Sequence, residues 1–542
     1  MTYNVSACLI IFILLEIWRP FYFLTDDNLT GTFPVLTEIG RHLKTGQSPF
    51  ISDYLFGGHY DLSRDPGSLL WHPFYLGPAL LSDTFARFWM LDITAFLYLL
   101  LTTVGFTILA HTLRREFDLN LPDLWLVFYT MSYVFSMYIL MIGPSWITFL
   151  GNQSALPWLT LCILDKKLIR GTALVALVTL HQFVGSYAAM TLSNTLLLTL
   201  FALGITTCRK SPRPLFIWCA GTLLGLLLIS PLLFHVLDGF AHTARLKGLS
   251  LDRNSMFAVP AAIFPFSFFF GTWTEPFSHA MGNLSLLTYP YLSTLLACAA
   301  AWCLVPALYS SSRWRPMEIL CLAMVALTAL LIIRPDTIAQ AMQQLPLLKS
   351  MRWPFREILQ FLFFFHLFLI LRPPLQPARL RWLIPIYSIA IFLLPLPFIH
   401  SPTLSLRAND RFATLSGNAD RFWNQVKLLL KPSDEIATVI DIDLWEKNGW
   451  AIPYTYLGTA NFPALYQITC ISGYSPTSPT DQLPLKTRPF YWFGAFSGNQ
   501  LDDILQERPN LKVIIIENAY PLKLSLYSKD GTKIDLTPYL PQ

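Results

Sequence analysis

Apolar segments of about twenty residues recur along the first four hundred positions, and short polar connections separate them. A helix needs about twenty apolar residues to cross the hydrocarbon core of a bilayer. The pattern therefore predicts a polytopic α-helical membrane protein with about eleven transmembrane helices. The expected spans are residues 5–24, 88–112, 122–142, 146–164, 168–187, 189–207, 214–236, 286–309, 317–333, 357–371 and 382–399.

Basic residues are concentrated in alternate connections between these spans. The connections read HTLRREFD, DKKLIR, CRKSPR, SSRWR and RPPLQPARLR, and together they hold 13 Lys and Arg. Short basic connections stay in the cytoplasm, so we expect the N-terminus to be cytoplasmic too. The long connections 25–85, 238–285 and 334–356, and everything after residue 400, are then extracytoplasmic.

The first apolar run has no basic stretch before it and no small-residue cleavage site after it. These features are typical of a retained helix rather than of a cleaved signal peptide. Together with the short cytoplasmic connections, they favour an integral protein of a bacterial inner (cytoplasmic) membrane.

The chain changes character after residue 400. Residues 401–542 hold 13 basic and 14 acidic residues, and turn residues separate short β-like runs at 435–442, 464–471 and 512–517. Alternating or β-branched runs bounded by turn residues indicate strands. We therefore expect two domains: a transmembrane domain at 1–400 with a large first external loop at 25–85, and an extracytoplasmic mixed α/β domain at 401–542.

The composition of the chain excludes several classes of function. The chain is 54% hydrophobic and 13% charged, whereas soluble domains carry about 25% charged residues. Its net charge of +5 gives no indication of a nucleic-acid partner, and its eight cysteines show no metal-type CxxC spacing. No P-loop motif is present, and the cytoplasmic connections are too short to build a nucleotide site. An active site would face outward, where a lipid must carry the donor.

Ionisable and turn residues are densest in one stretch, Phe23–Tyr75, which follows the first span. It opens with Asp26 and Asp27. A carboxylate that is partly screened from water at a helix end can act as a general base, and carboxylates also ligate divalent cations such as Mg²⁺ or Mn²⁺. Acidic residues also commonly mark the water interface, so these readings stay open.

Five short motifs follow one another in this stretch: Asp26-Asp27, Gly46 with Pro49, Gly57-Gly58, Asp65-Pro66 and Trp71-His72-Pro73. Their order resembles the first external loop of the GT-C class of membrane glycosyltransferases, and most of all the bacterial YfhO-like branch. Two later segments, residues 345–361 and ISGYSP at 471–476, resemble that branch as well.

The resemblance implies an inverting transfer of a sugar from a polyprenyl-phosphate donor to an envelope glycan or lipid acceptor on the extracytoplasmic face. An acidic residue of the first loop would deprotonate or orient the acceptor hydroxyl, and Asp27 is slightly favoured over Asp26. A clean DxD motif is absent, because Asn28 follows the acidic pair.

Three basic residues, Lys349, Arg352 and Arg356, precede the span at 357–371. Arg grips phosphate oxygens with a bidentate fork, so these residues are candidates for binding the donor phosphate. Anchoring to lipid headgroups explains them equally well. Glu357 follows at once and can pair with either arginine.

The rest of the first loop supplies candidate substrate contacts. Polar and aromatic groups of this kind bind or stack on sugars, although a loop held by local hydrogen bonds and an aromatic membrane interface explain them too. The candidates are Glu38, His59, Asp61, Arg64, Trp71 and His72, with Asp65 beside them.

Two other classes of function remain alternatives. A transporter or flippase of a lipid-linked glycan would favour inverted repeats and charges at the membrane midplane, and we find no obvious repeat. A non-catalytic envelope assembly factor would use its outer domain to bind a partner, and it would tolerate substitution of Asp26 and Asp27.

Overall fold

The structure is a computed structural model of the whole chain, and it is mostly helical with a small sheet near the C-terminus. It divides into two compact units. The helical unit comprises Met1–Tyr22, Ala95–Pro231 and Leu249–Phe398, and the mixed unit comprises Phe23–Thr94, Leu232–Gly248 and Ile399–Gln542. The structure describes residues 1–18, 20–24, 28–58, 60–64, 71–144, 146–241, 314–333, 336–344, 354–372, 419–441, 444, 461–471, 494–496, 505–506, 508–519 and 521–540.

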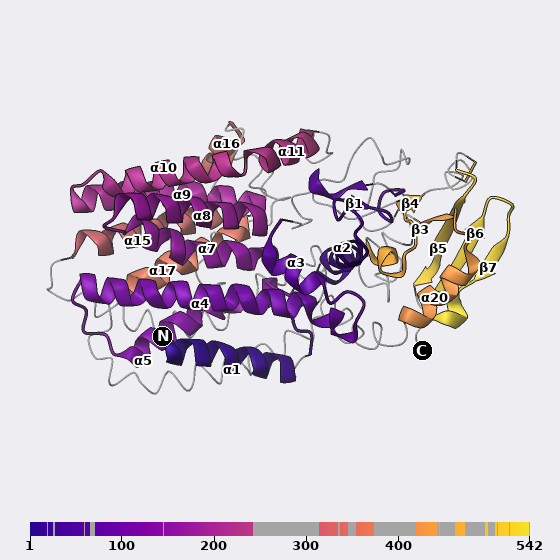
Figure 1. Cartoon of the computed structure of the whole chain (residues 1–542), viewed down its shortest axis with the longest axis horizontal. Helices are drawn as coiled ribbons and strands as arrows, with labels where there is room; N and C mark the ends of the chain where they lie inside the picture. Colours follow the sequence, from indigo (N-terminus) through magenta and orange to yellow (C-terminus); the bar gives the residue numbers. More distant parts are fainter. Residues whose placement is uncertain are drawn as a thin grey trace. The chain divides into compact units, whose positions relative to one another are not determined.

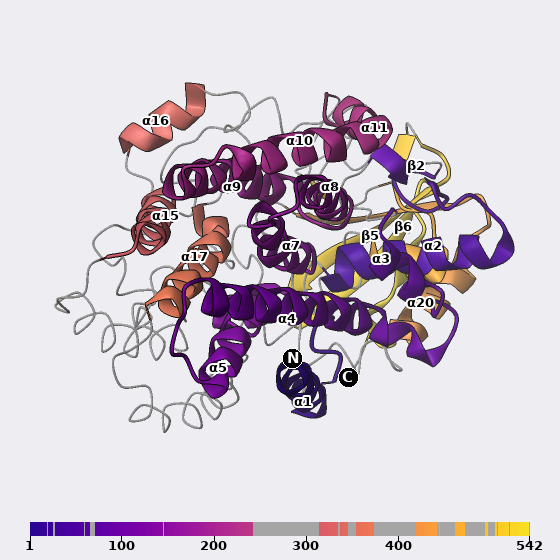
Figure 2. The same cartoon turned by 60° about the vertical axis from the view of Figure 1, so that its left-hand side comes forward.

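The helices of the helical unit pack side by side (Figure 1). Figures 1 and 2 show α8 beside α7 and α10. The helices are α1 (Thr2–Trp18), α4 (Met90–Glu116), α5 (Asp123–Val134), α6 (Met137–Ile142), α7 (Thr148–Ile163), α8 (Leu168–Gly185), α9 (Ala188–Arg209), α10 (Arg213–Leu228), α15 (Pro316–Ile333), α16 (Asp336–Gln344) and α17 (Ile358–Leu371), and α4 begins in the mixed unit.

Fewer of these helices than expected are long and apolar enough to cross a membrane. Within the described residues four qualify, at 86–116, 123–140, 168–185 and 190–209. The pair α15 and α16, bent by 87°, would make a fifth, and α1, α10 and α17 are shorter apolar helices. The expected spans 286–309 and 382–399 lie outside the described residues. The number of eleven transmembrane helices and their orientation in the membrane stay predictions.

Small residues let α8 and α10 approach closely. A Cβ atom at Gly221 would lie 2.5 Å from Val175 Cβ, and one at Gly225 would lie 2.8 Å from Thr179 Cβ. Without a hydrophobic driving force between helices in lipid, close packing of this kind drives helices together.

Arginine side chains join the basic connections at one end of the helical unit. Arg209 donates to the carbonyl of Leu164 (3.2 Å), and Arg213 donates to the carbonyl of Lys166 (2.7 Å). The C-terminal ends of α7 and α9 therefore lie together. The first residues of the same helices belong to the opposite end of the unit.

The mixed unit contains the first long connection together with C-terminal elements. Its helices and strands are α2 (Phe33–Thr45), β1 (Ile51–Ser52), β2 (Tyr60–Asp61), α3 (Pro73–Ala79), most of α11 (Ser230–Ala241), α20 (Ala419–Leu429), β3 (Glu435–Asp441), β4 (Gly494–Phe496), β5 (Leu511–Ala519), β6 (Leu522–Ser528) and β7 (Lys533–Asp535).

The first α-helix in the long connection after the first expected span is α2. Pro34 stands at its start, where its missing N–H is not needed. Phe33, Leu36 and Ile39 are buried along one face. The helix ends at Gly46, whose left-handed conformation (φ 71°) caps the last turn, as glycine does without strain.

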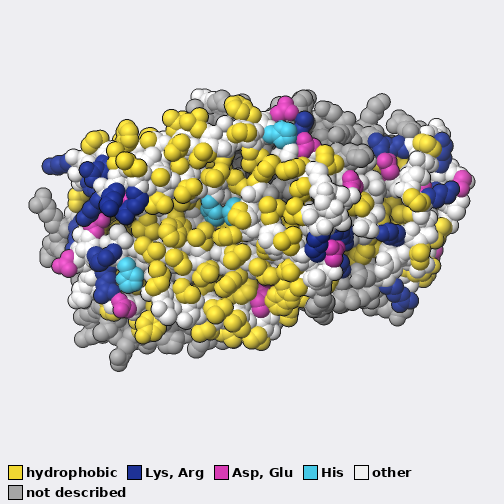
Figure 3. Space-filling view, in the orientation of Figure 1, with side chains coloured by type: hydrophobic (Ala, Val, Ile, Leu, Met, Phe, Trp, Pro, Cys, Tyr) yellow, Lys and Arg dark blue, Asp and Glu magenta, His cyan; other side chains and the backbone are white. Residues whose placement is uncertain are grey.

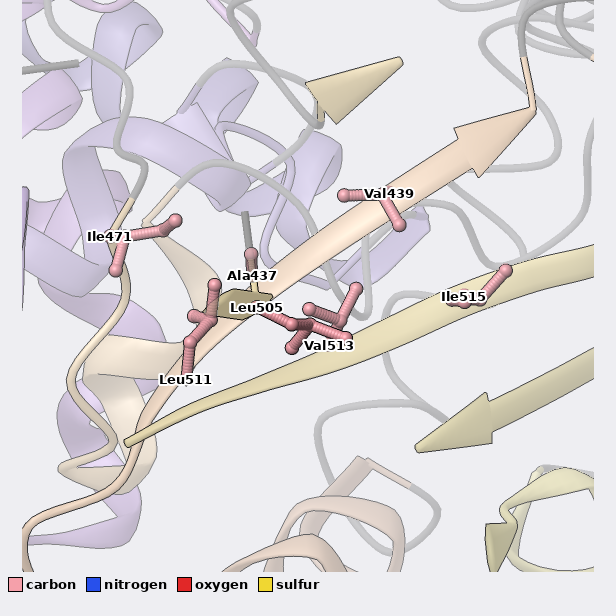
Figure 4. Close-up of a cluster of buried hydrophobic side chains, with 7 residues drawn as sticks. All are labelled: Ala437, Val439, Ile471, Leu505, Leu511, Val513 and Ile515. Atoms are coloured by element: carbon pink, nitrogen blue, oxygen red, sulfur yellow. The ribbon is translucent and has the colours of Figure 1, made fainter. Parts of the chain in front are cut away.

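The C-terminal strands form one mixed sheet in the order β4-β3-β5-β6-β7. β3 runs parallel to β4 and β5, whereas β5, β6 and β7 are antiparallel neighbours. The strands expected at 435–442 and 512–517 are β3 and β5. Figure 4 shows the apolar cluster on this sheet: Ala437, Val439, Ile471, Leu505, Leu511, Val513 and Ile515.

The strand expected at 464–471 is wrong. Residues Phe462–Tyr466 form a 3₁₀ helix with Pro463 in its first turn, and Gln467 then takes a left-handed conformation (φ 59°). These features stop an extended strand, since proline cannot donate to a ladder. Only Cys470 bridges to Ile436 of β3.

Within the mixed unit, the first connection is hydrogen-bonded to the C-terminal region. The Gly57 amide donates to the Cys470 carbonyl (2.9 Å), and the Cys470 amide donates to the Tyr54 carbonyl (2.8 Å). Arg41 donates to the Leu465 carbonyl (2.8 Å). The expected domain boundary at residue 400 stays a prediction, but the two segments belong to one compact unit.

We expect Gly40→Ala to destabilise the mixed unit. Gly40 lies where α2 crosses α3, and a Cβ atom there would lie 1.9 Å from the Ala79 carbonyl oxygen, which belongs to rigid backbone. Overpacking of this kind costs about 1–3 kcal/mol. Gly77→Ala in α3 is the matched control, because nothing lies within 4 Å of its Cβ position. Thermal unfolding of purified protein measures both, and equal melting temperatures for the two variants would contradict the packing.

Candidate functional site

Several predicted site residues lie outside the described residues: Asp26, Asp27, His59, Asp65, Lys349 and Arg352. The chain on either side of the acidic pair is held in place, however. The Phe23 amide donates to Asp92 Oδ1 (2.8 Å), and Asn28 Nδ2 donates to the Phe23 carbonyl (2.9 Å). Phe23 and Asn28 are therefore bonded to each other, and Phe23 is bonded to the start of α4.

Glu38 is buried in the mixed unit, with 1% of its surface exposed. Its carboxylate accepts hydrogen bonds from Ser52 Oγ and from the Asp53 amide, both at 2.7 Å. Burial raises the pKa of the carboxyl to about 7, although these hydrogen bonds oppose the shift. The side chain therefore fixes the turn after α2 and positions the loop.

Asp61 and Arg64 form an ion pair (3.2 Å) at the end of β2. The same carboxylate lies 3.3 Å from His235 Nε2, and Arg64 lies 3.4 Å from Asp238 of α11. Asp61 also accepts from the amide and hydroxyl of Ser63. This half-exposed cluster ties the first long connection to the second, and charged and histidine side chains gather near α11 in Figure 3.

The two-stranded sheet of β1 and β2 connects two predicted site residues, Glu38 and Asp61. β1 pairs with β2 so that Ser52 faces Tyr60 and Ile51 faces Asp61. Because Ser52 is bonded to Glu38, the buried carboxylate and the Asp61 cluster support the same hairpin.

Trp71 and His72 have different environments. His72 is buried, and its Nδ1 accepts from the Phe74 amide (3.2 Å), which caps α3. Trp71 is exposed and lies against Phe50, with ring centroids 4.9 Å apart. The Trp71–Phe50 pair offers the kind of aromatic surface on which sugars stack, whereas His72 holds the helix start.

Arg356 lies in an aromatic enclosure in the helical unit, within the 3₁₀ turn Pro354–Glu357 that precedes α17. Only 8% of its surface is exposed. The guanidinium carbon lies 4.1 Å from the centre of the Tyr187 ring, and about 6 Å from the rings of Trp146 and Phe149. A cation over such rings is attracted by their quadrupoles.

Polar side chains continue from Arg356 into the helical unit. Glu357 is buried and accepts from Ser193 of α9. The side-chain amides of Gln360 and Asn194 meet at 2.7 Å, and Asn152 donates to Thr191 (3.1 Å). The starts of α7, α9 and α17 are thus joined by a buried polar network.

A buried hydroxyl lies close to this arginine. Arg356 and Glu357 both act electrostatically on the phenol of Tyr138 in α6. Within the part of the chain that the structure describes, the Tyr138 oxygen is buried and makes no hydrogen bond.

The described residues contain no group of three or more His, Cys, Asp or Glu that could hold a metal ion. Asp26 and Asp27 lie outside the described residues, so their role as ligands of a divalent cation stays a prediction.

The sequence did not predict the residues that surround the Asp61–Arg64 ion pair or those that surround Arg356. His235 and Asp238 join the loop cluster, and Trp146, Phe149 and Tyr187 enclose Arg356. The aromatic residues at 146 and 187 stand at breaks between expected spans, which is a signal that could have marked them as interfacial.

Comparison with protein-family models, with curated proteins and with solved structures finds no match for this chain.

We expect Glu38 to make stability depend on pH. The folded carboxyl has a pKa of about 7 against 4.5 normally, so between these values the folded state holds a proton that the unfolded state has released. Stability is then highest below pH 4.5 and falls by roughly 3 kcal/mol as pH rises to about 7. Glu38→Gln, which cannot ionise, should lose this slope. The difference in melting temperature between the two proteins, measured from pH 5 to 8, checks it, and parallel curves would contradict it.

Proposed function

We propose that this protein is a membrane glycosyltransferase of the GT-C type. It moves a sugar from a polyprenyl-phosphate-linked donor to an envelope glycan or lipid acceptor on the extracytoplasmic face of a bacterial inner membrane. Asp26 or Asp27 is the base, and Arg356 binds the donor phosphate.

The observation that carries the proposal is the buried cation at Arg356. A charge enclosed by aromatic rings interacts strongly with an opposite charge, because little water screens it. The guanidinium carbon lies 4.1 Å from the centre of the Tyr187 ring, and an arginine side chain carries five N–H donors in one plane. Such a side chain suits a polyprenyl phosphate, which joins a charged phosphate to a long apolar chain.

The chemistry follows from these groups. The Asp carboxylate takes the proton of the acceptor hydroxyl, and the oxygen attacks the anomeric carbon of the donor sugar from the face opposite the phosphate. The bond between the anomeric carbon and the phosphate oxygen breaks, and the polyprenyl phosphate leaves with the electron pair. Arg356 stabilises the negative charge that grows on that phosphate. The anomeric configuration inverts, and no covalent intermediate forms.

The residues of the first loop have supporting roles in this proposal. Trp71 with Phe50 stacks on a sugar ring, and Asp61 with Arg64 lies beside it. Glu38 and His72 position the loop from within. Arg352 and Lys349 add positive charge near the donor phosphate.

We expect Arg356→Ala to lower sugar transfer by roughly a hundredfold or more, since it removes a charge contact that strengthens in the transition state. Arg356→Lys should restore only part of the rate, because an ammonium cannot bind two phosphate oxygens in a plane. Transfer from a polyprenyl-phosphate sugar, measured per folded molecule in proteoliposomes, is the readout.

Arg372→Lys is the matched control for this measurement. Arg372 lies at the other end of α17, equally buried, 4.3 Å from the Trp314 ring and 2.8 Å from Glu318. It should change stability but leave transfer per folded molecule intact. Native rates in Arg356→Ala would show that the phosphate is bound elsewhere.

The acidic pair decides between an enzyme and the other classes. We expect Asp26→Asn or Asp27→Asn, whichever removes the base, to abolish transfer while the melting temperature and membrane insertion stay native. A flippase would keep moving its lipid-linked glycan in a fluorescence-quenching assay on the same vesicles. An assembly factor would show no defect in either assay, and that result would refute the enzymatic proposal.

A further inference from the structure

We propose that the basic end of the helical unit contains a binding site for an anionic phospholipid, formed by Lys166, Lys167 and Lys210. These lysines come from two connections, between α7 and α8 and between α9 and α10. The site is independent of the proposed transfer reaction, because it lies at the helix ends opposite to Arg356.

Hydrogen bonds hold the two connections together. Arg209 and Arg213 donate to the carbonyls of Leu164 and Lys166, at 3.2 and 2.7 Å. Arg170 binds both oxygens of Asp165, at 2.7 and 2.8 Å. The arginines are thereby occupied within the protein and build a fixed platform.

The lysines, unlike Arg170, form no ion pair among the described residues. No Asp or Glu of the described residues lies within 4.0 Å of the ammonium groups of Lys166, Lys167 or Lys210. Residues 165–170 and 208–213, which include the adjoining helix ends, carry six basic residues against the single acidic residue Asp165, and Arg170 already neutralises that carboxylate. Three exposed ammonium groups thus remain to attract an anion.

The surface next to these lysines is apolar. Ile169 is 86% exposed and Phe216 is 58% exposed, and further exposed leucines follow along α10 at 223 and 227. Figure 3 shows Lys and Arg side chains gathered at the end of a largely hydrophobic face. A ligand that fits both surfaces has a negative head and apolar chains, which describes an anionic phospholipid better than a nucleic acid or an acidic peptide. Basic sites at the cytoplasmic ends of membrane helices bind such headgroups.

The backbone at Lys210 supports a role for its side chain. Lys210 ends α9 in the left-handed conformation (φ 50°, ψ 41°), which glycine adopts without strain and other L-residues rarely adopt. A lysine at this position costs stability that glycine would restore. The side chain has a use, in this proposal, that offsets the strain.

The test compares the protein in detergent with added phosphatidylglycerol or phosphatidylcholine. Phosphatidylglycerol should raise the melting temperature and be retained in native mass spectrometry, and phosphatidylcholine should do neither. The variant Lys166→Ala/Lys167→Ala/Lys210→Ala should lose this effect, with affinity falling roughly fivefold per lysine. Lys427→Ala/Lys431→Ala/Lys529→Ala removes the same charge from exposed sites of the mixed unit and should keep the effect.

Lys210→Gly separates lipid binding from a structural role. Relief of the backbone strain should raise the melting temperature without lipid, while the shift caused by phosphatidylglycerol should shrink. A triple variant that keeps the lipid shift, or a control variant that loses it equally, would overturn the proposal. Displacement of the lipid by excess inorganic phosphate would overturn it too, since it would mean that the site takes a free anion.

Discussion

The cost of leaving a polar group without a partner in an apolar environment decides where this chain places its polar residues. Inside the helices, threonine hydroxyls return to the carbonyl four residues earlier, as at Thr103, Thr130 and Thr195. Such bonds satisfy the hydroxyl within its own helix, so no partner on a neighbouring helix is needed. Charged groups are instead placed at helix ends, where carbonyls, aromatic rings or opposite charges can receive them.

The two ends of the helical unit meet this constraint in different ways. At the basic end, arginines bind backbone carbonyls and surface carboxylates, and lysines point to water. At the other end, Arg356 is covered by aromatic rings and continues into a network of amides and hydroxyls. The first arrangement fixes connections between helices. The second keeps a charge in surroundings of low dielectric, where an anion would interact with it most strongly.

Local patterns in the sequence were enough to predict elements that depend on their own residues. The β-like runs at 435–442 and 512–517 predicted β3 and β5. The pattern failed at 464–471, where Pro463 and the left-handed Gln467 override a β-like composition. The expected span 122–142 matches the candidate membrane span at 123–140, within which the chain breaks at Phe135 and Ser136 between α5 and α6.

The candidate sites depend on contacts between residues far apart in the sequence, which a local pattern does not contain. Arg356 was predicted from its charge, but its enclosure by Trp146 and Tyr187 comes from helix packing. Asp61 was predicted, but His235 reaches it from another connection. Glu38 shows the same principle in reverse: its residue type suggested a substrate contact, and its burial against Ser52 turns it into the support of a loop. The chemical type of a residue indicates what it can do, and the packing around it decides which of those things it can reach.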